Sequence, residues 1–452
     1  MYVTRVVIDG VRGFSRSRTV DLDLSSNGAG PGWTVLAGRN ASGKSTLLRA
    51  IVLALAGPRR SAQLLTESDR WISEGASQAR VEVQILTSPH FDGFHPEDQR
   101  ASSRKIWLGV KWDLPEDWRG DPTIETLPEL KASPLLGRNT SATRRYASTA
   151  TWSEASKGFF YAAYGPFRRL TGAGPEAQRL MLAPIPLSRV VSLFREDISL
   201  AESVRWLQEQ QFRQLEQRRG AGELIDGVLG LLNDGLMPDE IRIERVDSEG
   251  LWALQAGDSL LVQELSDGYR TVSSLVTDLV RNLASTFSGF EIETTDGHPR
   301  VMQPGVVLID EVENHLHISW QRQIGPWLTA HFPNIQFLVT THSPYICQSA
   351  REGGLIRLSG ISEASGPKPV DEQLYRRVVH GTGDEAVASE LFGIDSLYQE
   401  DTRRMRRALT SLEANIALGR ASQDDRKEYE RLRAELTSSP LSRVAELSQD
   451  EN

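Results

Sequence analysis

Apolar and polar residues alternate in four short stretches of the N-terminal third of the chain, a period typical of half-buried strands. These stretches are residues 2–8, 19–24, 81–85 and 106–112. They predict an antiparallel sheet in this part of the chain. Two later runs, 305–309 and 335–339, are continuously apolar, which is typical of parallel strands buried on both faces.

Helical periodicity and stop signals mark six further segments. The predicted helices span residues 44–56, 199–219, 221–233, 271–284, 403–418 and 424–436. Two more strands are predicted at 241–246 and 252–255. Residues 115–157 are rich in Pro, Ser, Thr and Gly, which predicts a long loop or insertion.

The order of these elements predicts an α/β protein of four consecutive parts. Residues 1–190 form an N-terminal β-lobe that contains a phosphate-binding loop, and residues 191–260 form a helical lid insertion. Residues 261–360 complete the parallel sheet, and residues 361–452 form a C-terminal helical extension. The charged helical tail within it, about residues 384–437, is too short for another enzyme domain of ordinary size, so we expect the extension to mediate interactions.

Composition restricts the class of protein. The 452-residue chain carries 51 Lys and Arg against 60 Asp and Glu, a formal net charge of −9, which argues against general polyanion coating but permits a local basic patch. The single cysteine, Cys347, excludes a disulfide scaffold and Cys-based zinc sites. No signal peptide is recognisable, and the longest apolar stretch, 47–57, is too short to span a bilayer. We therefore expect a cytoplasmic protein with no membrane partner.

Residues 38–45 (GRNASGKS) fit the phosphate-binding pattern G-x-x-x-x-G-K-[ST] without a mismatch, between an apolar strand and a helix. The alternative is a chance Gly-rich turn. Lys44 is expected to reach the β- and γ-phosphates of ATP, and Ser45 is expected to bind Mg²⁺. The residues expected to contact the nucleotide are Gly38, Arg39, Asn40, Ala41, Ser42, Gly43, Lys44, Ser45 and Thr46.

Two adjacent carboxylates, Asp310 and Glu311, end the first continuous apolar run. Asp310 is expected to hold the Mg²⁺, and Glu311 to act as the base that polarises the attacking water. His342 follows the second run and is expected to touch the γ-phosphate, as a catalytic residue beside Glu311 and Lys44. Apolar strands that end in acids are common, and a lone His is more often structural, so this interpretation depends on the three features together.

A further anion site is predicted where residues 263–270 (QELSDGYR) enter a helix, because a Ser-x-Gly turn at a helix start can bind anions. One chain with a phosphate-binding loop does not need a second such site. In a dimer, each chain can offer its turn to the nucleotide of the other. Ser266 and Gly268 are therefore expected to contact the ATP bound by a partner copy.

Together these motifs resemble the ABC-type ATPase heads of the SMC, recombination-repair and overcoming-lysogenization-defect families, over roughly residues 1–360. The resemblance implies that residues 265–269 (LSDGY) are the signature motif, with Asp267 and Tyr269 departing from the family pattern. Residues 163–169 (AYGPFRR) and 310–317 (DEVENHLH) are similar to compact "AAA family" ATPase subunits of anti-phage systems such as Septu and PARIS.

The resemblance also raises roles for residues outside these motifs. It implies that Arg12 lies beside the nucleotide, and Gln84 is a candidate for the glutamine of the Q-loop. Arg168 or Arg169 could reach a phosphate or the dimer partner, and a solvated basic turn is the alternative.

The histidine pair after the carboxylates suggests a metal site. His315 and His317 are two residues apart, without a third His or Cys nearby. This spacing favours residues that contact the dimer partner over metal ligands.

Three functions remain open for such an ATPase. The first is a dimeric sensor, scaffold or gate for a separate effector, a nuclease or toxin, in phage defence, because no second catalytic motif follows His342. The second is a DNA-repair ATPase that acts directly on DNA. The third is a slow, nucleotide-locked interaction platform.

Overall fold

The computed structural model describes most of the chain as two compact units, Met1–Ala386 and Val387–Asn452. The described residues are 1–25, 30–65, 70–88, 91–92, 104–114, 131–147, 151–153, 158–168, 186–196, 198, 201–237, 241–393 and 398–436. Within these ranges, no helix is both long enough and apolar enough to cross a membrane.

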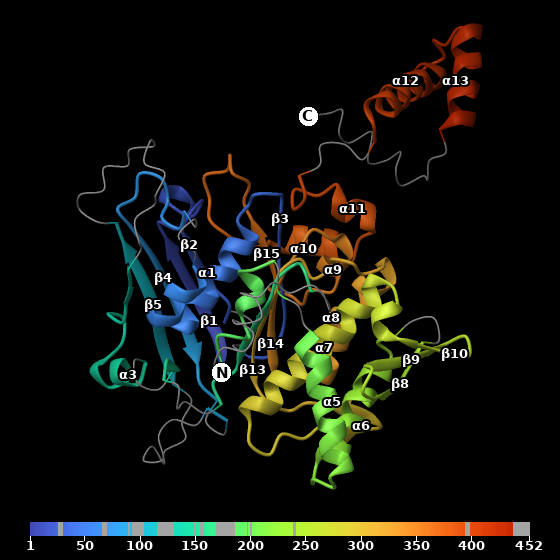
Figure 1. The fold of residues 1–452 in the computed structure, drawn as a ribbon. Coiled ribbons are helices and arrows are strands. Elements are labelled where there is room, and N and C mark those ends of the chain that lie inside the picture. Colours follow the sequence, from blue (N-terminus) through green and yellow to red (C-terminus); the bar gives the residue numbers. More distant parts are fainter. Residues whose placement is uncertain are drawn as a thin grey trace, which may run out of the picture. The chain divides into compact units, whose positions relative to one another are not determined.

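The N-terminal part forms a five-stranded antiparallel sheet, which confirms the expected β-lobe (Figure 1). Its strand order is β2-β1-β4-β5-β6. The strands are β1 (Tyr2–Asp9), β2 (Val20–Asp23), β4 (Gln78–Leu86), β5 (Lys105–Asp113) and β6 (Lys131–Pro134). The last strand and helix α3 (Ser141–Tyr146) lie inside residues 115–157, so this stretch is not the uniform loop that its composition predicts.

The second sheet has six strands in the order β16-β15-β3-β14-β13-β7. They are β3 (Gly32–Gly38), β7 (Tyr161–Tyr164), β13 (Gly305–Ile309), β14 (Ile335–Thr341), β15 (Leu355–Leu358) and β16 (Lys368–Pro369). All neighbours pair in parallel except β16, which is antiparallel to β15. The carboxyl ends of β3, β14, β13 and β7 therefore meet at one edge, where ligands of open α/β sheets bind.

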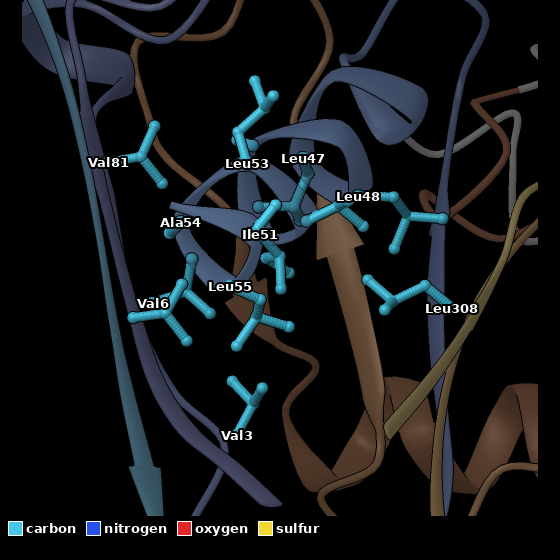
Figure 2. Packing of buried hydrophobic residues seen from close by; sticks show 14 of the residues in the cluster. Val3, Val6, Leu47, Leu48, Ile51, Leu53, Ala54, Leu55, Val81 and Leu308 are labelled. Carbon is cyan, nitrogen blue, oxygen red and sulfur yellow. The ribbon is translucent and has the colours of Figure 1, made fainter. Parts of the chain in front are cut away.

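Helix α1 (Lys44–Ala56) lies between the two sheets. Leu47, Ile51 and Leu55 belong to one buried cluster with Val6 of β1 and Leu308 of β13 (Figure 2). The helix is apolar around nearly its whole circumference, as expected for a helix covered on both sides. Gly57, at φ 82°, ends it and donates its N–H to the carbonyl of Leu53. The phosphate-binding loop is thus attached to the most buried helix of the core.

Further helices and strands lie on the other side of the parallel sheet (Figure 1). They are α5 (Ala201–Leu215), α6 (Ala221–Asn233), β8 (Arg242–Val246), β9 (Leu251–Gln255), β10 (Asp258–Leu261), α7 (Asp267–Thr286), β11 (Glu293–Thr295), β12 (His298–Arg300) and α8 (Ile318–His331). Of these, α7 and α8 lie nearer to the sheet than β8, β9 and β10 (Figure 1). The expected lid helices and the two strands that follow them are present. Tyr164, at the end of β7, donates its hydroxyl to Asp278 of α7 at 3.0 Å, which fixes the long helix to the sheet.

The C-terminal unit is shorter than the extension expected from residue 361. Helix α9 (Pro344–Gln348) lies between β14 and β15. Two further short helices, α10 (Glu372–Val379) and most of α11 (Gly383–Val387), follow β16 within the first unit. The Tyr375 hydroxyl of α10 donates to the carbonyl of Ala350 at 3.0 Å. Pairing of β16 with β15 and this contact explain why the boundary lies later than the sequence suggests.

The described helices of the second unit, α12 (Glu400–Ala417) and α13 (Gln423–Glu435), form a helical hairpin, as predicted. Leu409, Leu432 and Leu436 form its small buried cluster. Of the arginines near the start of α12, Arg403 and Arg404 pair with the acids three residues before them. These exposed i,i+3 pairs stabilise a helix only weakly, so the arginine cluster is largely balanced within its own helix.

Candidate nucleotide-binding site

The phosphate-binding loop joins β3 to α1 through two residues in the left-handed region, Ala41 at φ 61° and Gly43 at φ 100°. Gly43 is required there for a second reason, because a Cβ would lie 2.6 Å from the ring of Phe14. The Ser42 N–H donates to the carbonyl of Arg39 at 3.2 Å and closes the loop. The glycine therefore sets the curvature that aims the following helix N-terminus at a bound anion.

Lys44 lies across this loop. Its Nζ donates to the carbonyls of Gly38 at 3.0 Å and Arg39 at 3.1 Å. Burial lowers the pKa of the ammonium, while the carboxylates of Asp310 and Glu311 act in the opposite direction. The predicted phosphate-binding cation therefore lies close to the predicted magnesium and base residues.

The donor set fits a nucleotide and a magnesium ion. The Ser42 hydroxyl is buried without a hydrogen-bond partner, an arrangement that a phosphate oxygen would satisfy. Asp310 is buried, and its Oδ1 accepts the Thr340 hydroxyl at 2.5 Å. A carboxylate oxygen of Asp310 and the hydroxyl of Ser45 are ligands of the kind Mg²⁺ prefers.

Glu311 has an unusual backbone for a glutamate. Its φ of 45° lies in the left-handed region, which costs a non-glycine residue about 1 kcal/mol or more. Its N–H donates to Thr340 Oγ1 at 2.8 Å, and its Oε2 accepts Nδ2 of Asn314 at 2.7 Å. Strain of this kind at a carboxylate beside a phosphate-binding loop supports a functional role.

His342 follows β14, between the strands that carry the loop and the carboxylates. Its backbone N–H donates to Oε1 of Glu313. Burial, then the nearby charge of Lys44, lowers the pKa of the imidazole, which favours a neutral ring. Burial raises the pKa of the Glu313 carboxyl. Glu313 is not among the residues predicted from the motifs, although an acid two residues after Glu311 is a visible signal.

The loop after β1 reaches the phosphate-binding loop through other residues than Arg12. The Arg12 guanidinium lies over the ring of Trp71 at 5.6 Å, so a role beside the nucleotide remains a prediction. Phe14 packs against Gly43, and Arg18 donates to the carbonyl of Ser42 at 3.3 Å. Sequence analysis missed both of these contacts.

Gln84 is wrong as the Q-loop glutamine. Its side chain accepts the hydroxyl of Thr4 at 2.9 Å inside the antiparallel sheet. The neighbouring N–H of Val3 donates to Gln336, which lies at the N-terminal end of β14. The phosphate-binding loop follows the carboxyl end of β3, which is parallel to β14, so Gln84 lies at the opposite end of the strands.

Arg168, which follows β7, does not lie in a solvated turn. Arg168 is only 3% exposed, and its guanidinium donates to backbone carbonyls of the turn that carries Glu311. The Nη groups of the guanidinium therefore donate to the protein backbone and not to a phosphate. Arg169 lies outside the described residues.

Ser266 is exposed at the N-terminus of α7, and its hydroxyl makes no capping hydrogen bond. The helix begins at Asp267, earlier than predicted. Gly268 is packed against Trp320 of α8, where a Cβ would lie 2.4 Å from the indole. Tyr269 meets the same indole edge-on at 4.7 Å between ring centroids. Trp320 therefore fixes the signature turn (residues 265–269) on its buried side, and Ser266 is exposed to solvent.

The two histidines after the carboxylates have local roles. His317 is the N-cap of α8 and accepts the Ser319 N–H at 3.4 Å. His315 Nδ1 lies 3.9 Å from Asp267 of the signature turn. Across the described ranges, no group of three or more His, Cys, Asp or Glu is placed to hold a metal ion. The metal hypothesis for this pair gains no support.

A strand–loop–helix phosphate site, with an acid pair two strands away on the same sheet edge, defines a P-loop ATPase domain. Residues 5–104 match the family described as "AAA domain". Residues 190–348 match the family described as "AAA domain, putative AbiEii toxin, Type IV TA system". The two matched stretches contain the phosphate-binding loop, the acid pair and His342, so the chain is similar to AAA-domain proteins there, as the motifs implied.

Two relatives show which ATPases and defence proteins this chain is similar to. The chain is 39% identical over 112 residues to the retron Ec83 probable ATPase of Escherichia coli, covering 25% of this chain and 19% of that protein. It is 23% identical over 350 residues to the Septu protein PtuA of Bacillus mycoides (strain KBAB4), covering 75% of this chain and 38% of that protein. The chain thus spans well under half the length of these relatives. The expected similarity to a Septu ATPase is confirmed.

Solved structures include an SMC head bound to the C-terminal winged-helix domain of ScpA, with a TM-score of 0.47 and 14% identity. That comparison covers 82% of this chain and 97% of the other. The SMC head domain from Thermotoga maritima gives a TM-score of 0.36 at 16% identity, covering 82% of this chain and all of that chain.

The role of Lys44 in nucleotide binding is directly testable. Lys44→Ala removes the P-loop side-chain cation expected at the β- and γ-phosphates, so the Kd for ATP should rise tenfold or more, about 1.4 kcal/mol. Isothermal titration calorimetry measures this change. Lys111→Ala is the matched control, since Lys111 pairs with Asp113 on the surface of β5, and it should bind ATP normally. Unchanged ATP affinity in Lys44→Ala would remove the lysine from the site.

Proposed function

We propose that this protein binds and hydrolyses ATP, dimerises around two ATP molecules, and acts as the sensor, scaffold or gate of a separate effector. We place this activity in the bacterial cytoplasm, as part of anti-phage defence. The observation that carries the proposal is the meeting of Lys44, Asp310, Glu311 and His342 at one edge of the parallel sheet.

The chemistry assigned to each residue follows from its place. Lys44 and the N-terminus of α1 bind the phosphates, and Glu311 accepts the proton of the attacking water. Ser45 and Asp310 would hold Mg²⁺, which offsets the negative charge of the phosphates when bound. His342, favoured as a neutral imidazole by burial, is suited to a hydrogen bond with the γ-phosphate.

The signature turn supports a dimer. It exposes Ser266 at the start of the 20-residue helix α7, whose N–H groups and dipole favour an anion. His315 adjoins Asp267 of this turn, so residues that follow the catalytic acids and the signature share one surface. A partner's γ-phosphate placed there would join the two chains only while ATP is intact.

A separate effector is supported by two observations. The described part of the chain after His342 forms two strands of the six-stranded sheet, short helices and a helical hairpin. The buried cluster of that hairpin is made of leucines, a composition suited to contacts and not to catalysis. The relatives named above are a Septu protein and a retron ATPase. We infer that a nuclease or toxin activity resides in another polypeptide.

Single-turnover ATPase measurements with purified protein test the proposal. The expected result is Mg²⁺-dependent hydrolysis. Its rate per protein chain should rise with protein concentration, because the active species is a dimer. Stimulation by DNA that weakens with salt would favour direct action on DNA instead. Hydrolysis too slow to complete one turnover in hours would favour a nucleotide-locked platform.

The C-terminal hairpin gives a separate prediction. A chain ended at residue 395 lacks α12 and α13, which form their own compact unit, so ATPase activity should stay within about twofold of the full chain. Association with the effector or self-assembly should be lost, as measured by mass photometry or co-purification. Insolubility of the shortened chain would show that the first unit depends on the hairpin.

A further inference from the structure

The turn Asp310–Val312 directs its carbonyl groups at one buried side chain. Arg168 Nη1 donates to the carbonyl of Asp310 at 3.0 Å and to that of Gly165, in its own loop, at 3.0 Å. Its Nη2 donates to the carbonyls of Glu311 at 3.1 Å and Val312 at 3.2 Å. One planar guanidinium thus binds three consecutive carbonyls of the turn.

The N–H groups of the same three residues are bound from the other side. The N–H of Asp310 donates to the carbonyl of Tyr164 at 2.8 Å, and that of Val312 to the carbonyl of Thr340 at 3.1 Å. The N–H of Glu311 donates to the Thr340 hydroxyl at 2.8 Å. The neighbouring strands therefore satisfy the donors of the turn, and Arg168 satisfies its acceptors.

This division explains how Glu311 is kept at φ 45°. In the left-handed conformation, the carbonyl of Glu311 points to the same side as the carbonyls of Asp310 and Val312. Burying these carbonyls without a hydrogen-bond donor would cost free energy of folding. An arginine is suited to this position because its planar fork presents several donors in fixed directions. Burial lowers the pKa of Arg168 to about 10, so the guanidinium stays charged near neutral pH.

We infer that Arg168 is a positioning residue, which holds the Asp310–Val312 turn so that the Glu311 carboxylate faces the γ-phosphate. This role rests on the proposed hydrolysis of ATP. It makes β7 and residues 165–168 a part of the ATPase site, although the hydrogen bonds of Arg168 go to backbone carbonyls. Asp310 is placed by the same contacts and would be displaced with Glu311.

The test compares Arg168→Lys with Arg189→Lys. Arg189 is the matched control because it is equally buried, its pKa is lowered by burial to the same value, and it stacks on Phe160 away from the turn. Lysine keeps a cation but cannot bind three carbonyls in fork geometry. In Arg168→Lys, kcat should fall about tenfold or more while the Kd for ATP changes less than about threefold. Arg189→Lys should keep the wild-type kcat.

A second readout is independent of hydrolysis. Hydrogen exchange in the nucleotide-free protein should accelerate in the peptide that covers residues 306–316 for Arg168→Lys and stay unchanged for Arg189→Lys. Arg168→Gln, which buries no charge and keeps two donors, serves if the lysine variant does not fold. If the wild-type protein hydrolyses no ATP but exchange still accelerates in Arg168→Lys, the proposed function is refuted, while the role of Arg168 in positioning the turn stands. Unchanged exchange with an unchanged kcat would overturn that role.

Discussion

Glu311→Gln should lower the rate of ATP hydrolysis by roughly 10² or more, the size expected for loss of a general base. The amide keeps the shape of the side chain, and its oxygen can still accept the hydrogen bond from Asn314. Lys44 and Asp310 are unchanged, so ATP should bind with nearly wild-type affinity. The ATP-bound dimer should then accumulate, as measured by light scattering or mass photometry.

The matched control for this variant is Glu249→Gln. Glu249 is exposed in the turn between β8 and β9, and its loss of charge should leave kcat unchanged. Wild-type hydrolysis in Glu311→Gln would show that another group activates the water. In that case Glu313, buried two residues later with a raised pKa, would be the first carboxylate to test.

Ser266→Arg should block both dimer closure and hydrolysis while ATP binding stays near normal. The serine is exposed and makes no capping hydrogen bond, so the substitution costs the fold little. Its expected effect is at the partner's phosphate, where an arginine side chain fills the space that the γ-phosphate would need. Sedimentation with ATP and Mg²⁺ should give only the monomer.

Ser248→Arg is the control for adding a cationic side chain at an exposed serine of the same compact unit, because Ser248 lies in the turn between β8 and β9. It should dimerise and hydrolyse ATP like the wild type. Full activity of Ser266→Arg at concentrations where it stays monomeric would show that the signature turn has no role in catalysis.

Much of the fold was predictable because burial leaves a clear pattern. The α1 segment was predicted with its observed bounds, since it is apolar on all sides and ends in Gly-Pro. β13 and β14 were predicted because their sequences are almost continuously apolar, as expected for strands buried on both faces. Alternating strands gave the antiparallel lobe. Local patterns were sufficient where the local environment alone decides the conformation.

The rest depended on contacts between distant segments. β7 was not predicted as a strand, although the apolar residues before Gly165 were a usable signal. α8 was missed because Pro326 and several polar residues interrupt its periodicity. The role of Arg168 could not be predicted, since its partners lie more than 140 residues away. Gln84 was misplaced because strand periodicity does not reveal which end of a sheet faces the nucleotide.

The central claim is that two chains complete each other's ATP sites, and mixing two inactive variants tests it most directly. Lys44→Ala supplies an intact signature turn, and Ser266→Arg supplies an intact phosphate-binding loop, so their mixed dimer has one complete site. ATPase activity in an equal mixture should rise well above the sum of the two separate variants, because only the mixed dimer contains a complete site. Activity no higher than the sum of the two separate variants, with both chains folded and mixed dimers detected, would contradict catalysis across the dimer.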